Sequence, residues 1–179
     1  NAISATLPIL LLLSMLFYDS ELVWKSKSLN FSSIENSTSF SNVALFISKF
    51  VTVFFISILL TFSCILLGVL FQLFYNYPII DVKAYLSLFY YIGLPASLCG
   101  LLIVALQYIF KNKYIALVIA AAFLAVTNSL LGNAFGFSHP LTRFANFMPD
   151  VYSDITGFSY LSKAFIVKML YSFSFALLL

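Results

Sequence analysis

The stretch FVTVFFISILLTFSCILLGVLFQLF, residues 50–74, decides what kind of fold this chain can adopt. It carries no charged side chain. As one helix it is long enough to cross the hydrocarbon core of a bilayer, which takes about 20 residues. A helix at the surface of a soluble protein needs a polar outer face, and this stretch has none. We therefore expect residues 50–74 to span a membrane.

The rest of the chain repeats this pattern. Hydrophobic residues make up 63% of it and charged residues 8%, whereas a soluble domain carries about 25% charged residues. We therefore expect an integral membrane protein with one all-α domain over 1–179, a polytopic transmembrane helical bundle. About five spans are predicted, at residues 1–18, 50–74, 84–110, 114–131 and 163–179.

A polar segment, residues 19–48, separates the first two spans. It opens with Asp19-Ser20-Glu21, whose short oxygen-bearing side chains can cap the start of a helix. Apolar residues are then mixed with Trp24, Lys25 and Lys27, and the Ser- and Asn-rich stretch 32–42 is typical of a loop. We expect a short amphipathic helix lying on the membrane surface.

Two other regions depart from a plain span. Gly93 and Pro95 lie inside residues 84–110, where a proline removes a backbone hydrogen bond and predicts a kink. Residues 132–162 are too apolar for a solvated loop and too rich in Gly and Pro for a span. We expect them to re-enter the membrane from the outer side, shielded by neighbouring helices.

Orientation follows from the positions of the basic residues. Segments 19–49 and 111–113 together carry five lysines, whereas the opposite side has Lys83 and Arg143, with Lys163 at its border. Because basic residues favour the cytoplasmic side, we place 19–49 and 111–113 in the cytoplasm.

Catalytic and metal-binding motifs are not found. His139 could be combined with Ser138 and Asp150 into a nucleophile set, but a loop histidine is the simpler interpretation. No His/Cys cluster suited to zinc and no Gly-rich nucleotide loop occurs, so we expect no enzyme and no cofactor. The net charge of +3 does not favour nucleic-acid binding. Cys64 and Cys99 are expected to act as small apolar residues; a disulfide between them is the alternative.

Segment 19–48 has two interpretations: an amphipathic connector resting on lipid, or a docking element for a soluble partner. In the second, a tryptophan flanked by charges is the anchor. The candidate docking residues are Glu21, Trp24, Lys25, Lys27 and Glu35. The central spans carry no charged side chain, which argues against an ion- or proton-coupled carrier.

The layout resembles the permease subunits of export-type ABC transporters. The resemblance rests on the segment ELVWKSKSL, residues 21–29, on Ser48-Lys49-Phe50 opening the next span, and on YSDITGF, residues 152–158. It is closest to the bacterial proteins in which such a permease is fused to a metallo-aminopeptidase, and it covers family spans two to six. The chain starts and stops inside apolar runs, so we expect a fragment of a longer protein.

The resemblance implies a function in the bacterial cytoplasmic membrane. Residues 19–40 would be the coupling helix that touches an ATP-binding cassette subunit, and residues 134–160 would be re-entrant outer helices. The partners would be that subunit, a second permease in a homo- or heterodimer, and membrane lipid. Any ATPase or peptidase activity would lie outside this chain. A non-transporting membrane anchor for a fused or associated enzyme is the alternative.

Overall fold

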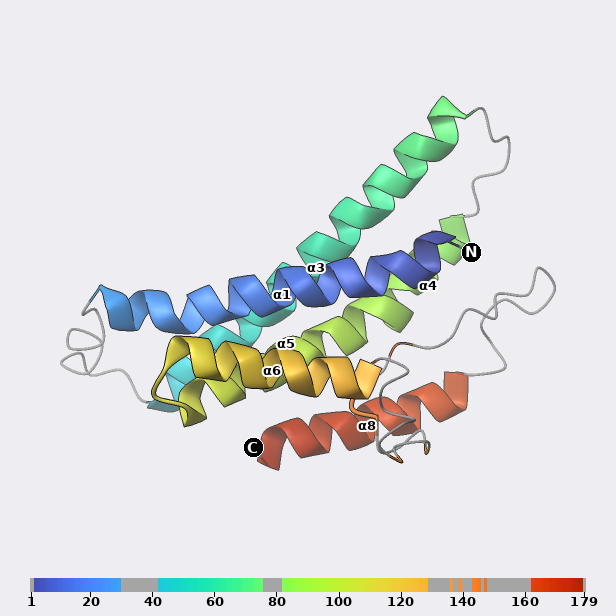
Figure 1. Cartoon of the computed structure of the whole chain (residues 1–179). Helices are drawn as coiled ribbons and strands as arrows, with labels where there is room; N and C mark the ends of the chain where they lie inside the picture. Colours follow the sequence, from blue (N-terminus) through green and yellow to red (C-terminus); the bar gives the residue numbers. More distant parts are fainter. Residues whose placement is uncertain are drawn as a thin grey trace.

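The computed structural model describes residues 2–29, 42–75, 82–128 and 162–178, together with positions 136, 139, 143–145 and 147. All regular elements within these ranges are helices, which confirms the all-α class. In chain order they are α1 (Ala2–Ser28), α3 (Asn42–Phe74), α4 (Val82–Leu88), the π-helical segment η1 (Phe89–Gly93), α5 (Leu94–Ile109), α6 (Lys113–Asn128) and α8 (Ser162–Leu178) (Figure 1).

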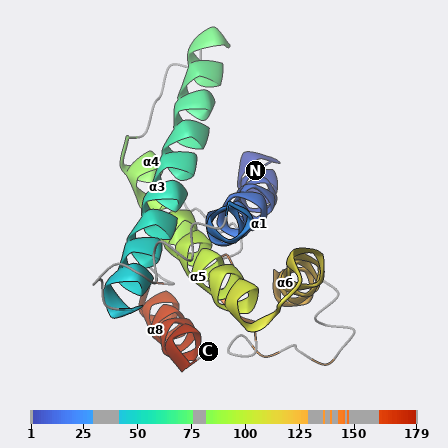
Figure 2. The ribbon, with the colours of Figure 1, turned by 90° about the vertical axis from the view of Figure 1, so that its left-hand side faces the viewer.

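Helix α5 is the centre of the bundle. It packs against α1, α3, α6 and α8, which surround it in the end-on view of Figure 2. Its face toward these neighbours is buried, and Leu102 and Ile103 are almost inaccessible. Met15 of α1, Val53 of α3 and Phe165 of α8 fill the space around it. The core is therefore built on the middle of α5.

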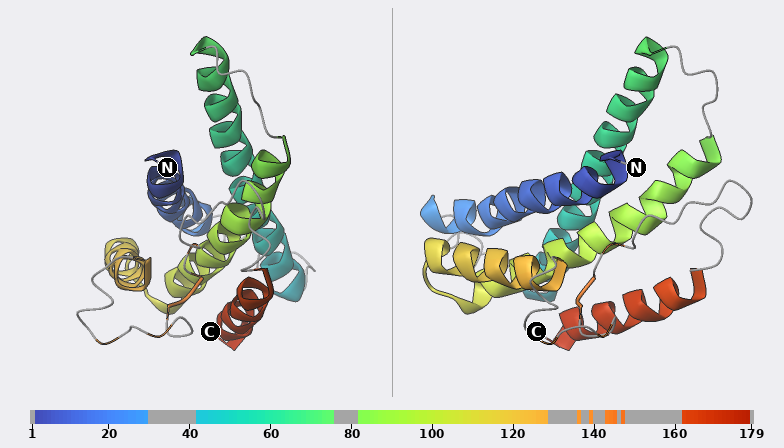
Figure 3. Two further views of the ribbon diagram at one scale, coloured as in Figure 1. Left: turned by 90° about the vertical axis from the view of Figure 1, so that its right-hand side faces the viewer. Right: turned by 45° about the vertical axis from the view of Figure 1, so that its right-hand side comes forward.

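Helix α3 leaves this bundle toward its C-terminal end. It packs beside α1 and α5 through its first half and then diverges from both, as the two views of Figure 3 show. Its diverging half is apolar and exposed, including Phe62, Leu67 and Phe71. The ring of Phe62 stacks on that of Phe89 in η1 at a centroid distance of 6.5 Å, yet all three side chains stay more than half exposed.

Two helical stretches are long and apolar enough to cross a membrane, Ile47–Phe74 and Val82–Ile109. The first is mostly exposed and the second mostly buried inside the bundle. The shorter α6 is also apolar. The other three of the five predicted spans, at residues 1–18, 114–131 and 163–179, stay a prediction.

The prediction for the start of segment 19–48 is wrong in one respect. Asp19-Ser20-Glu21 does not cap a new helix, because α1 continues without a break from Ala2 to Ser28. Residues 42–48 likewise belong to α3. A charged residue does not end a helix when its neighbours keep their i to i+4 backbone bonds. Residues 30–41 lie outside the described part of the chain.

The helix over 82–109 changes its geometry where Gly93 and Pro95 were expected to disturb it. The π-helical segment η1 ends at Gly93, and Pro95 occupies the first turn of α5. Proline fits a first turn because its missing N–H is not needed there. A single π-helical turn inside an α-helix is a recognised cause of helix bending.

Part of the predicted re-entrant region packs onto the bundle. The ring of Phe144 lies between those of Phe123 in α6 and Phe175 in α8, with centroid distances of 6.2 and 5.8 Å. The backbone N–H of Ala145, a residue with a left-handed φ of 40°, donates to Oγ of Ser172 at 3.1 Å. The rest of 132–162 lies almost wholly outside the described residues.

Candidate functional site

The end of α1, the start of α3, the end of α5 and the start of α6 meet at one end of the bundle (left in Figure 1). Lys113 of α6 forms an ion pair with Glu21 of α1. Lys49 of α3 donates a hydrogen bond to the hydroxyl of Tyr108 in α5. These two side-chain contacts therefore tie the helices in two pairs, α1 with α6 and α3 with α5.

Trp24 provides the second link from α1. Its indole Nε1 donates a hydrogen bond of 2.5 Å to Oε1 of Gln107 in α5. Gln107 is fully buried, and its Nε2 has no hydrogen-bond partner among the described residues. A cavity of about 210 Å³ opens beside this pair, lined by Glu21, Trp24, Ser28 and Lys113.

The predicted docking residues therefore fall into three groups. Glu21 and Trp24 make contacts within the chain, to Lys113 and Gln107. Lys25 is exposed on the same turn of α1. The Lys27 side chain and Glu35 lie outside the described residues, so their predicted role stays a prediction.

Asp19 is the residue whose position the sequence did not indicate. Its side chain is fully buried, and neither carboxylate oxygen has a hydrogen-bond partner within the described ranges. The sequence suggested a polar helix cap at this position, because the uncharged run stops at residue 18. A signal was available: Leu11, Met15, Asp19 and Val23 recur every four residues and are all buried, as one helical face requires.

Gly100 lets α1 and α3 approach α5 at the level of Asp19. A Cβ added at Gly100 would lie 2.6 Å from Cε of Met15, 2.6 Å from Cγ1 of Val53 and 2.7 Å from Oδ2 of Asp19. No real Cβ tolerates such distances. The carboxylate therefore packs directly against the α5 backbone, in space that only a glycine leaves open.

Further buried polar side chains lie between Asp19 and α6. The Cys99 thiol is fully buried and lies within interaction range of Asp19 and of the Asn128 side chain. Asn128 donates from Nδ2 to Oγ1 of Thr127 at 3.2 Å, while its Oδ1 has no partner in the described chain. Both cysteines are free thiols. A set of buried polar side chains therefore links α1, α5 and α6.

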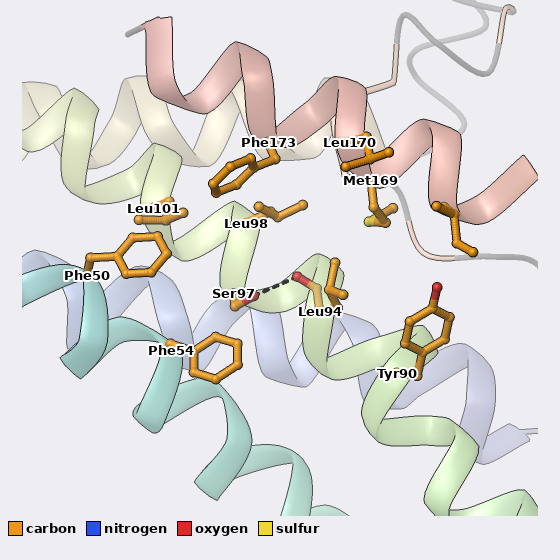
Figure 4. A pocket seen from close by; sticks show the side chains of 11 residues that line it. Phe50, Phe54, Tyr90, Leu94, Ser97, Leu98, Leu101, Met169, Leu170 and Phe173 are labelled. Carbon is orange, nitrogen blue, oxygen red and sulfur yellow. Dashed lines mark hydrogen bonds between the residues drawn. The ribbon is translucent and has the colours of Figure 1, made fainter. Parts of the chain in front are cut away.

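A separate apolar groove of about 270 Å³ lies between α3, α5 and α8 (Figure 4). Its walls are formed by Phe50, Phe54, Tyr90, Leu94, Ser97, Leu98, Leu101, Ile166, Met169, Leu170 and Phe173. The hydroxyl of Ser97 donates to the backbone oxygen of Leu94 at 2.7 Å, so its proton is already engaged within α5. Only apolar or amphipathic groups suit such walls.

Neither location has the ligand set of a metal centre, because no cluster of three His, Cys, Asp or Glu side chains occurs in the described ranges. His139 is exposed. Comparisons with family models, with curated proteins and with solved structures found no match for this chain. The function must therefore be argued from the geometry alone.

Proposed function

We propose that this chain is the transmembrane permease part of an ATP-driven ABC exporter in a bacterial cytoplasmic membrane. It would work with an ATP-binding cassette subunit and a second permease, as a homo- or heterodimer. The observation that carries the proposal is the double link from the end of α1 to α5 and α6, through Trp24–Gln107 and Glu21–Lys113. A force applied at this end reaches the centre of the bundle.

Embedding in a membrane accounts for the exposed apolar surface. Successive long helices run in alternating directions through the bundle, as a chain that crosses a membrane repeatedly requires (Figure 1). Large apolar side chains are exposed along α1, α3, α6 and α8. Apolar patches of this extent are uncommon on soluble monomers, because exposing them to water is unfavourable. Contact with lipid removes that unfavourable exposure. We therefore assign the five helical stretches α1, α3, α4–α5, α6 and α8 to five spans.

Coupling in this proposal runs through α1 itself. Lys25 faces outward at the end of α1, where an acidic surface of the ATP-binding partner could contact it. Glu21 and Trp24 on the same helix hold α6 and α5. A partner that displaced α1 would therefore move α5, which contacts every other long helix. Glu21 and Trp24 act as internal transmitters, and Lys25 as the external contact.

The groove between α3, α5 and α8 supports an apolar or amphipathic cargo. Its 11 lining residues include only two with hydroxyl groups, Tyr90 and Ser97. Moving lipid-like molecules requires no fixed charge along the walls. The π-helical segment η1 borders this groove, since Tyr90, one of the lining residues, belongs to η1.

Capture of the ATP-binding partner tests the proposal. The full-length protein is purified from its own membranes in three forms: unchanged, Lys25→Glu, and Lys163→Glu as the matched control. Lys163 is equally exposed but opens α8 at the opposite end of the bundle. We expect Lys25→Glu alone to reduce recovery of an ATP-binding cassette subunit several-fold. Recovery of no such subunit with any form, or equal recovery with all three, refutes the coupling role.

Topology is tested separately, with reporter domains inserted after Leu29, Tyr75 and Asn112. These positions follow α1, α3 and α5, respectively. Five spans predict that the reporters at Leu29 and Asn112 lie on the cytoplasmic side and the one at Tyr75 on the outer side. Reporters at Leu29 and Tyr75 on the same side would show that α3 does not span the membrane.

A non-transporting anchor for a fused or associated enzyme is the second candidate. One observation favours it: Glu21 and Trp24 are engaged inside the chain, so no docking surface need exist there. The anchor predicts that no ATP-binding subunit is recovered. It also predicts that filling the groove, for example by Ser97→Phe, leaves the attached activity unchanged, whereas the permease predicts loss of transport.

A further inference from the structure

Asp19 presents a carboxyl group that the proposed permease mechanism does not use. The side chain is fully buried among α1, α3 and α5, and both oxygens lack hydrogen-bond partners in the described part of the chain. An ionised carboxylate without a partner is among the most costly groups to place in apolar surroundings. The neutral acid avoids that cost because it carries no charge.

The groups that face Asp19 do not neutralise it by pairing. Cys99 and Gly100 face it from α5, Val53 from α3, and Met15 from its own helix. Among the charged side chains of these elements, Glu21 of α1 pairs with Lys113 of α6, Lys49 of α3 donates to Tyr108, and Lys25 of α1 is exposed. Within the described ranges, no cation forms an ion pair with Asp19.

On the side of α5, the carboxylate has no room for a further ligand atom. Even one added carbon at Gly100 would lie 2.7 Å from Oδ2 while also striking Met15 and Val53. A metal ion needs several ligand oxygens at about 2–2.6 Å and room for them, and the described residues provide no such set. A proton needs only a lone pair.

We propose that Asp19 is a proton-binding site inside the bundle, reached from the end of α1 along Ser20, Trp24 and Gln107. Ser20 and Trp24 are four residues apart and share a face of α1. Trp24 contacts Gln107, which lies about 10 Å along α5 from Gly100 by helical rise. The Ser20 Oγ and Gln107 Nε2 atoms are buried and unpaired among the described residues. Such atoms are the usual hosts of ordered water.

Binding and release of one proton change the charge of the Asp19 side chain by one unit. A proton from water at the cavity beside Glu21 and Lys113 forms one O–H bond on Asp19, and the charge of −1 disappears. Release breaks that bond and returns the proton to water, which leaves a carboxylate that must be hydrated. Hydration requires α1 to move away from Gly100, so proton release and movement of α1 occur together. This inference does not depend on an ATP-binding partner.

Infrared absorption of the full-length protein in lipid vesicles tests the site. At neutral pH the unchanged protein is expected to show the carbonyl stretching band of a protonated carboxylic acid. Asp19→Asn, which has nearly the same shape and no charge, should remove the band, whereas Glu21→Gln should retain it. Absence of the band from the unchanged protein, or its persistence in Asp19→Asn, overturns the proposal.

The route is tested by transferring the vesicles to D₂O and following the shift of the same band. Gln107→Leu removes an unpaired amide from the proposed route and should slow exchange several-fold. Gln72→Leu is the matched control, because Oε1 of Gln72 is also buried and unpaired but lies near the far end of α3. Unchanged exchange in Gln107→Leu, or equal slowing in both variants, overturns the route.

Discussion

The indole Nε1 of Trp24 donates to Oε1 of Gln107 across 83 positions of sequence, and this bond joins the last turns of α1 to α5. Gln107 is fully buried, with Nε2 unpaired in the described structure. The bond therefore compensates part of the cost of placing an amide in the bundle. The same contact fixes how α1 is rotated about its own axis, which brings Asp19 inward and leaves Lys25 outside.

Replacing Trp24 by Phe should destabilise the bundle. The ring is largely kept, but both polar atoms of the Gln107 side chain are then unpaired, which costs about 1–3 kcal/mol. Gln107→Leu in the same background should recover part of this loss, because no buried amide remains. Thermal unfolding in detergent of the single and double variants measures both effects. Equal stability of Trp24→Phe and the unchanged protein would show that the bond contributes nothing.

Gly100→Ala should also destabilise the protein. The new Cβ would overlap Met15 and Val53 at 2.6 Å and force the helices apart, at a cost of about 1–3 kcal/mol. Gly68→Ala is the matched control, since its nearest atoms belong to Tyr85 at 3.8 and 3.9 Å. Alanine there should stabilise the helix by up to about 1 kcal/mol. Similar unfolding temperatures for the two variants would contradict the close packing at Gly100.

The Glu21–Lys113 ion pair should contribute little to stability. The two side chains are 58% and 32% exposed, and exposed pairs contribute about 0–1 kcal/mol. A double-mutant cycle of Glu21→Gln and Lys113→Met, measured by unfolding, should give a coupling energy within this range that decreases with salt. A coupling of several kcal/mol would show that the pair is shielded from solvent. Its expected role is to position α6 against α1.

The positions of the helices could be predicted, but the ends of α1 and α3 could not. Residues 84–110 coincide closely with the helical stretch Val82–Ile109, and residues 50–74 lie within α3, which begins earlier, at Asn42. Long apolar runs restrict the chain to helices. Segment 19–48 was expected to leave the bundle because it contains charges. In the structure α1 continues through Asp19 to Ser28, since tertiary contacts of Trp24 and Glu21 hold those turns in place.

The candidate site was predicted only in part. Glu21 and Trp24 were selected as contacts to a partner, and the structure pairs them with Lys113 and Gln107 instead. Nothing in the local sequence indicates this pairing, because the partners are 92 and 83 positions away. Gln107 could be recognised only as an isolated polar residue in an apolar run.

The helical class and the apolar lengths of α3 and α4–α5 can be read from the sequence, because both depend on residues that are neighbours along the chain. The sequence also indicates that the disturbed turn lies near Gly93 and Pro95, since the proline acts on its own backbone. The tertiary structure alone decided that Asp19 is buried against Gly100. Burial depends on which helix faces approach one another, and that is set by packing between segments far apart in sequence.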